Sequence, residues 1–207
     1  TVLSRDIVSD LLSYFLTSAI ADEVQRHSSF LEGKLGSKIA SRKLTIEEKP
    51  LTKNVFFSYF DDEGVATAAR DVVKGGRLKG YFLSSYSARK LGMQTTGNAG
   101  GSHNLRLSSR LTSRGDNFAR MLKKMGTGLL VTEVMGQGVN YVTGDYSRGA
   151  SGFWVENGEI QYPVEEITIA GNLADMYRGI VAVGNDELTR GTKTCGSVLI
   201  EEMAVAG

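Results

Sequence analysis

The sequence is poor in the residues that cross-link or interrupt a fold. A single cysteine, Cys195, occurs among 207 residues, so no disulfide can form within the chain, and a reducing compartment suits the lone thiol. Only two prolines occur, Pro50 and Pro163, and we find no low-complexity linker or internal repeat. These absences favour one domain stabilised by an ordinary hydrophobic core.

Long hydrophobic runs and an excess of one charge are also missing. No apolar stretch approaches the ~18 residues that a membrane-spanning helix needs, and residues 1–6 lack the order of a secretory signal. We therefore expect a cytoplasmic protein without a membrane partner. Lysine and arginine total 24 against 23 acidic residues, and this balance does not favour nucleic-acid binding, which depends on clustered positive charge. Because the chain does not begin with Met, we expect a fragment or a processed product.

Histidine is scarce, which limits the metal chemistry available. Only His27 and His103 occur, and neither belongs to an H-E-x-x-H pair, which places two imidazoles on one helical face. Residues 22–27 combine carboxylates with His27, but a solvated helix face explains them better. Cys195 has no histidine near it in sequence that could activate a thiolate. We therefore expect no independent peptide-bond hydrolysis by this chain.

The hydrophobic pattern predicts an α+β fold. Apolar residues recur every three to four positions in the first half of residues 7–31, which predicts a long N-terminal helix with Ser4 or Asp6 as N-cap. Strands are expected at residues 43–48 and 197–205, and hairpins at residues 72–82 and 152–162 around Gly-Gly and Asn-Gly turns. Short helices are expected at residues 116–124 and 172–180. The whole indicates a mostly antiparallel, barrel-like sheet with a long N-terminal helix and a few short helices.

Three polar loops contain several glycines each: residues 95–104, 136–140 and 144–152. None has the spacing of a phosphate-binding loop before a helix. Glycine lets a backbone approach a ligand or another chain closely, although tight turns and bulges use it more often. Arg148 is the most attractive single side chain, because a guanidinium can bind a carboxylate with two parallel hydrogen bonds.

The same loops resemble a known family. Residues 135–139 (MGQGV) and 143–160 (TGDYSRGASGFWVENGEI) closely resemble the PmbA (TldE) branch of the TldD/PmbA metalloprotease family. The resemblance continues through residues 162–164, 166–173 and 183–186, and earlier through residues 83–92 and 97–101.

The resemblance implies that residues 1–207 are the C-terminal domain of a chain about twice as long, without its N-terminal domain. It also implies a cytoplasmic protease assembly that trims unfolded or precursor peptides and an antitoxin, and that carries the older label modulator of DNA gyrase. In that assembly a TldD-like subunit holds zinc through an H-E-x-x-x-H motif and a late cysteine, and a PmbA-like subunit helps to enclose the peptide channel.

The zinc ligands do not carry over to this chain. The family's metal helix would fall at residues 12–18, which contain no histidine. Cys195 is a weak candidate for the late cysteine, because one thiolate without two imidazoles is not a zinc site. We therefore expect no cofactor in this chain and zinc in the partner subunit.

Our leading hypothesis is a metal-free partner subunit that pairs with a TldD-like zinc-bearing subunit, or with itself, and binds an extended peptide. The alternatives are an autonomous metallopeptidase of the same family and a non-enzymatic module that acts on DNA gyrase. The residues expected to contact peptide or partner are Gly97, Asn98, His103, Asn104, Gln137, Asn140, Asp145, Tyr146, Ser147 and Arg148.

Overall fold

The computed structural model describes residues 1–20, 24, 26–52 and 57–207. Its strands form two sheets, with one long helix, α1 (Arg5–Ala19), in contact with both. The first sheet has seven strands in the order β13 (Ala204–Ala206), β8 (Glu159–Asn172), β7 (Asp145–Glu156), β6 (Gly128–Met135), β1 (Val2–Leu3), β12 (Val198–Ile200) and β9 (Ile180–Val183). The second has six, in the order β10 (Leu188–Arg190), β11 (Lys193–Cys195), β5 (Leu105–Ser108), β2 (Thr45–Glu48), β3 (Arg70–Lys74) and β4 (Arg77–Leu78).

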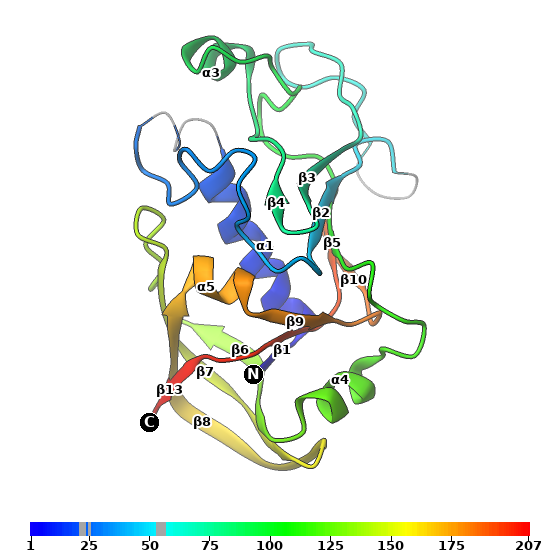
Figure 1. Cartoon of the computed structure of the whole chain (residues 1–207), viewed down its shortest axis with the longest axis vertical. Coiled ribbons are helices and arrows are strands. Elements are labelled where there is room, and N and C mark those ends of the chain that lie inside the picture. The colour runs from blue at the N-terminus through cyan, green and yellow to red at the C-terminus, as the bar shows by residue number, and fades with distance from the viewer. Residues whose placement is uncertain (21–23, 25, 53–56) are drawn as a thin grey trace.

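The α+β class and the mostly antiparallel pairing are confirmed. Among the described strands, β1 with β6 and β5 with β11 are the parallel pairs, and the other ladders are antiparallel. Both sheets are open in this part of the chain, ending at β13 and β9 and at β10 and β4. The expected barrel-like core is therefore a pair of open sheets around a shared helix (Figure 1).

Helix α1 forms because its apolar residues share one face and are buried together: Ile7, Val8, Leu11, Leu12, Phe15 and Ala19. The helix contacts β6 of the first sheet and β10 and β11 of the second. On its buried face, the Phe15 ring meets the Tyr177 ring edge-on at 5.9 Å, and the Tyr177 hydroxyl donates to the Leu11 carbonyl at 2.7 Å. Each such buried apolar side chain stabilises the fold by about 1.5–3 kcal/mol.

The helix is shorter than expected. Its last residue is Ala19, because Ile20 takes an extended conformation and pairs with Phe82 in an isolated parallel bridge. Ser4 is the N-cap, as expected, but its side chain makes no capping hydrogen bond. In place of the predicted continuation of the helix, the chain forms turns at residues 26–27 and 30–33. The Ser29 hydroxyl donates to the Ser18 carbonyl at 2.5 Å, which folds this segment back on the helix end.

The β7–β8 hairpin is confirmed and is longer than predicted. Its turn residues, Asn157 and Gly158, have φ angles of 54° and 80°, the left-handed values that a tight primed turn requires. The ladder runs from the Glu156–Glu159 pair back to the Asp145–Asn172 pair. Much of β8 is exposed, so its outer half lacks the apolar alternation by which a strand is recognised from sequence.

The remaining predicted elements are confirmed in outline. Strand β2, the β3–β4 hairpin and helices α4 (Phe118–Met125) and α5 (Leu173–Arg178) all lie within four residues of their predicted bounds, although β4 has only two residues. Asn117 and Asn172 cap the two helices with their side chains. Helix α3 (Ser85–Lys90), which we did not predict, begins with a capping box between Ser84 and Ser87.

The predicted C-terminal strand is wrong as one element, because it divides between two partners. Strand β12 pairs with β1 and β9, whereas β13 pairs with β8 at the opposite edge of the same sheet. The exposed Glu201 and Glu202 lie at the break.

Helix α4 packs against the other face of the first sheet, in a smaller hydrophobic cluster formed by Val2, Met121, Leu122, Leu130, Val155 and Leu199. None of the described helices has the length and apolar character needed to cross a bilayer.

Gly152 on β7 provides a test of the close approach between β6 and β7. A Cβ there would lie 1.9 Å from the Leu130 carbonyl oxygen, and overpacking of this kind costs about 1–3 kcal/mol. We expect Gly152→Ala to lower the free energy of unfolding by that amount in urea titrations followed by circular dichroism. Gly115→Ala is the matched control, because the nearest atom to its Cβ would be the Ser113 hydroxyl at 3.8 Å. Equal stabilities of the two variants would contradict the close approach.

Candidate functional site

The predicted site residues lie in two clusters that share no hydrogen bond in the described part of the chain. The first, which we call the Glu48 cluster, contains Gly97, Asn98, His103 and Asn104 and lies where β2 ends and β5 begins. The second, the Arg148 cluster, contains Gln137, Asn140, Asp145, Tyr146, Ser147 and Arg148 and lies beside the middle of α1. Each is a separate candidate.

A buried carboxylate organises the first cluster. Glu48 is only 1% exposed, and Arg70 donates to it from Nε at 2.7 Å. The Asn98 side-chain amide and the His103 backbone N–H each donate to the other oxygen of Glu48 at 2.7 Å. Arg70 also donates to the Tyr81 carbonyl at 2.9 Å and to Asn98 Oδ1 at 3.1 Å. The ion pair and these hydrogen bonds offset the desolvation penalty of the buried carboxylate.

The contacts of Asn98 and His103 are therefore internal. Asn98 Oδ1 also accepts from the Thr96 hydroxyl at 2.7 Å, and His103 Nε2 lies 2.9 Å from the Gly97 carbonyl oxygen. Asn104 is buried with φ of 42°, and its side-chain amide donates to the Lys49 carbonyl at 3.2 Å. These contacts shape the loop at residues 95–104 and leave its predicted role in peptide binding to be tested.

Sequence reasoning missed Glu48 and Arg70, the two charges at the centre of this cluster. A signal existed for Glu48: in a strand, residues two apart share a face, and Ile46 is fully buried. The strand assignment therefore placed a carboxylate on the buried face, where an ionised group requires a partner. The partner, Arg70, is 22 residues away, and no local pattern identifies it.

The Arg148 cluster combines a cation with an open hollow. The Arg148 guanidinium donates from Nη1 to the Tyr14 hydroxyl on α1 and from Nε to the Met135 carbonyl at 3.2 Å. A hollow of about 570 Å³ is lined by Tyr14, Gly136, Gln137, Gly138, Val139, Tyr141 and Arg148. Gln137 is exposed at its rim, so this cluster offers a charge, an amide and backbone groups to a bound chain.

The loop beside the hollow is held by its own polar residues. Asn140 Oδ1 accepts from the backbone N–H groups of Val142 and Thr143 at 2.9 and 3.2 Å. Asp145 accepts from the Thr143 hydroxyl at 2.6 Å and from the Asn172 amide at 3.3 Å. The Ser147 backbone N–H donates to the Gly138 carbonyl at 2.7 Å. Asn140 and Asp145 thus position the loop through their side chains, whereas Ser147, an exposed residue, contributes through its backbone.

Tyrosine rings form the floor of this cluster. The Tyr14 ring lies 6.1 Å from that of Tyr146 and 6.4 Å from that of Tyr141. Burial raises the pKa of Tyr146 to about 12. Burial also raises the pKa of Tyr14, although the positive charge of Arg148 opposes this shift. Both phenols are therefore protonated at neutral pH, and the guanidinium provides the charge that faces the hollow.

A zinc ion does not fit the described residues. No three His, Cys, Asp or Glu side chains among them gather as a metal site would require. The Cys195 thiol is buried and donates to the Arg5 carbonyl at 3.3 Å, about 10 Å along the helix axis from the start of residues 12–18. His27 is exposed and lies 2.5 Å from Glu32. Of the predicted segment at residues 22–27, residues 22, 23 and 25 lie outside the described residues.

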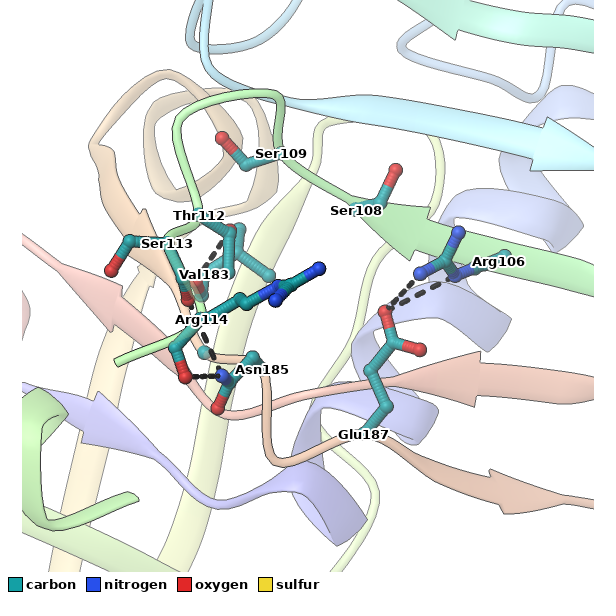
Figure 2. Close-up of a pocket in the computed structure, with 10 residues that line it drawn as sticks. Arg106, Ser108, Ser109, Thr112, Ser113, Arg114, Val183, Asn185 and Glu187 are labelled. Atoms are coloured by element: carbon teal, nitrogen blue, oxygen red, sulfur yellow. Dashed lines mark hydrogen bonds and ion pairs between the residues drawn. The ribbon is translucent and has the colours of Figure 1, made fainter. Parts of the chain in front are cut away.

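Another motif of the sequence, residues 183–186, has a structural explanation. Asp186 accepts from the backbone and hydroxyl of Ser197 at 3.0 and 2.9 Å, and the Asn185 backbone N–H donates to the Asp116 carbonyl at 2.8 Å. A hollow of about 340 Å³ lies beside this motif. Figure 2 shows the Asn185 amide in it, turned toward the backbone carbonyls of Ser113 and Arg114, to which the amide donates. This motif therefore connects β9 to the loop before α4.

Comparison with known proteins agrees with this fold and these motifs. The profile of the PmbA/TldA metallopeptidase C-terminal domain matches residues 1–207. The chain belongs to the PmbA/TldD metallopeptidase family. The chain is 54% identical to metalloprotease PmbA of Escherichia coli O157:H7 and 47% identical to a PmbA homolog of Haemophilus influenzae. Each alignment covers 100% of this chain and 45% of the relative, which confirms the resemblance to the PmbA branch.

Solved structures of the family have the same fold. A structure from Bacteroides thetaiotaomicron matches with a TM-score of 0.92 and 34% identity over 100% of this chain and 46% of its own. One from Thermotoga maritima matches with a TM-score of 0.90 and 38% identity over 99% and 49%. Both are provisionally named modulators of DNA gyrase. TldE of Thermococcus kodakarensis, 23% identical, shares the fold with a TM-score of 0.85 over 100% and 49%. The chain therefore spans about half the length of the relatives it matches.

The Glu48–Arg70 pair leads to a prediction about stability. Removing one partner of a buried ion pair leaves the other charge uncompensated, at a cost of about 3–5 kcal/mol. We expect Glu48→Ala to lower the free energy of unfolding by that amount in urea titrations. Asp175→Ala is the control, because the Asp175 side chain is 77% exposed and pairs with Arg178 at the surface. Exposed ion pairs contribute about 0–1 kcal/mol to stability. Similar losses of stability in the two variants would argue against a central role for Glu48.

The Cys195 thiol should be unreactive in the folded protein. Burial, helped by the nearby Asp6, raises its pKa from 9.0 to about 12, and the thiolate is the reactive form. A disulfide reagent at pH 8 should label the native protein slowly and the urea-unfolded protein fast, with Cys195→Ser as the blank. Fast labelling of the native protein would show that the thiol is accessible.

The same pKa shift makes stability depend on pH. Since the pKa of the Cys195 thiol is higher in the folded protein than in the unfolded chain, its contribution to stability is complete below pH 9 and is lost as the pH rises toward 12.

Proposed function

We propose that this chain is the C-terminal domain of a metal-free, PmbA-type subunit that pairs with a TldD-like zinc-bearing subunit in a cytoplasmic metalloprotease. Its part is to hold an extended peptide for the partner's zinc site, in the turnover of unfolded or precursor peptides. Membership of a metallopeptidase family is the firm starting point. The division of labour between two subunits is the proposed part.

The observation that carries the proposal is the contact between Tyr14 and Arg148. Tyr14 lies in residues 12–18, where the resemblance implies the zinc ligands of the catalytic subunit. Here that face of α1 holds a phenol bonded to a guanidinium, and a cation repels a metal ion rather than binding it. The same helix position is thereby suited to binding the carboxylates or carbonyls of a peptide.

The hollow beside Arg148 supports a peptide rather than a compact ligand. Residues 136–138 follow the last residue of β6, Met135, at a bend where Gly136 has a φ of 80°, and Gln137 is exposed there. A polypeptide laid along such a segment can form main-chain hydrogen bonds without demanding a particular sequence. Arg148 would then bind a carboxylate or a carbonyl of that peptide through charge-assisted hydrogen bonds. The Glu48 cluster, with Gly97, Asn98, His103 and Asn104, stays a second predicted contact surface for the peptide or the partner.

The experiment uses the full-length protein reconstituted with its zinc-bearing partner, and measures kcat/KM for an unfolded peptide. Loss of a charge-assisted hydrogen bond of about 1.5–3 kcal/mol should lower kcat/KM about 10–100-fold in Arg148→Ala. Arg120→Ala is the matched control, since Arg120 is an exposed arginine on α4, and it should retain full activity. An unchanged rate in Arg148→Ala would remove the peptide-binding role.

Elemental analysis of the isolated full-length protein tests the metal-free assignment separately. We expect no stoichiometric zinc and no peptide cleavage without the partner. One zinc per chain together with chelator-sensitive cleavage would favour the autonomous metallopeptidase instead. Each isolated sample should also be tested with the partner restored, so that an inactive preparation is recognised.

A further inference from the structure

A basic hollow of about 640 Å³ lies at the opposite end of β2 and β5 from the Glu48 cluster, between the β3–β4 turn and the end of α5. No described Asp or Glu lines it, although acidic and basic residues are almost equal in number in the whole chain, 23 against 24. Its lining includes six cationic side chains: Lys38, Arg42, Lys43, Lys74, Arg110 and Arg178. The positive charge of this part of the surface is therefore concentrated in the basic hollow.

Half of these cations are engaged by groups of the protein. Lys74 pairs with Asp71, Arg178 pairs with Asp175, and Lys43 Nζ donates to the Val181 carbonyl at 2.8 Å. Across the described residues, no carboxylate pairs with Lys38, Arg42 or Arg110. Like charges in one concavity repel each other, and a bound anion would remove that repulsion.

The walls of the basic hollow are fixed by backbone hydrogen bonds. Ser41 donates from its backbone N–H to the Tyr177 carbonyl at 2.9 Å, which joins one wall to α5. Gly76 in the β3–β4 turn donates to the Leu44 carbonyl at 2.9 Å and joins the opposite wall to the residue that precedes β2. The hydroxyls of Ser41 and Thr45 line the hollow with the cations. A preformed concavity with hydroxyl, ammonium and guanidinium donors is suited to an anion with many acceptor oxygens.

We propose that the basic hollow binds a small anion that carries two or more phosphate groups. Guanidinium groups bind phosphate oxygens with two parallel hydrogen bonds, and lysines add point charges. The volume falls within the range of small-molecule sites, about 300–1,000 Å³. The described lining contains no aromatic ring on which a base could stack, which is the usual device for binding single-stranded nucleic acid.

The neighbouring hollow in Figure 2 shows why the basic hollow is distinct. There the Arg106 guanidinium is neutralised by Glu187, with Nε and Nη2 at 3.1 and 2.7 Å from one carboxylate oxygen. The Asn185 amide is engaged by backbone carbonyls. Arg114 is the remaining cation of that lining, so its charge is far weaker than that of the basic hollow.

Isothermal titration calorimetry of the full-length natural protein with tripolyphosphate, at low ionic strength, tests the proposal. We expect saturable 1:1 binding that weakens steeply with added salt. The Arg42→Gln/Arg110→Gln double variant should bind about 100-fold more weakly, which is about tenfold for each guanidinium replaced. The control is Arg89→Gln/Arg120→Gln, which makes the same change in net charge at exposed residues of α3 and α4 and should bind as the natural protein does.

Further ligands identify the anion. Comparable affinities for ATP and tripolyphosphate would assign recognition to the phosphate chain, and much tighter binding of ATP would assign it to a nucleotide. The proposal is overturned by the absence of saturable binding, by equal weakening in the two double variants, or by monophosphate binding as tightly as tripolyphosphate. Binding of a single-stranded oligonucleotide without binding of tripolyphosphate would also overturn it.

A second variant, Lys38→Gln, repeats the test at an exposed side chain in case the double variant is unstable, and circular dichroism checks the folding of each protein. No peptidase activity is measured, so failure of this proposal and failure of the proposed function are independent results.

Discussion

The fold depends on the burial of one face of α1 against both sheets. Its apolar residues contact strands that are far apart in the chain, and the Tyr177 hydroxyl binds a carbonyl of the helix from the other side of the core. Both candidate clusters use the same helix as their support. Tyr14 carries the partner of Arg148, and Ile20 pairs with Phe82, whose ring faces the Arg70 guanidinium at 4.9 Å. A shift of α1 would therefore move both clusters together.

Polar residues serve opposite purposes in the two clusters. Around Glu48 three donors, from Arg70, Asn98 and His103, are directed at one buried carboxylate, so this charge helps to hold a loop in place. Around Arg148 the guanidinium has a phenol and a carbonyl as partners but no carboxylate among the described residues. The first arrangement is closed and the second remains able to accept an anion. This difference, rather than the number of polar residues, makes the Arg148 cluster the better suited of the two candidates to bind an anion.

The parts of the fold that depend on local pattern could be predicted from the sequence. The repeat of apolar residues located the first half of α1, and the Asn157-Gly158 pair located the β7–β8 turn. The end of α1 could not be predicted, because Ile20 is extended by pairing with Phe82, 62 residues further on. Arg148 was identified by its chemistry, but its partner Tyr14 is 134 residues away. The chain-wide balance of charge likewise concealed the basic hollow, since net charge contains no information about position.

The position of β1 has a consequence for the order of folding. This strand has only two residues, yet it lies between β6 and β12 and thereby joins the two halves of the seven-stranded sheet. The Thr1 backbone nitrogen donates to the Ile200 carbonyl across a separation of 199 residues. The sheet is therefore complete only when the first and the last part of the domain meet, so its assembly waits for a contact of very high sequence separation. Domains dominated by such contacts fold slowly, and until closure the edges of β6 and β12 remain open to pairing with other chains.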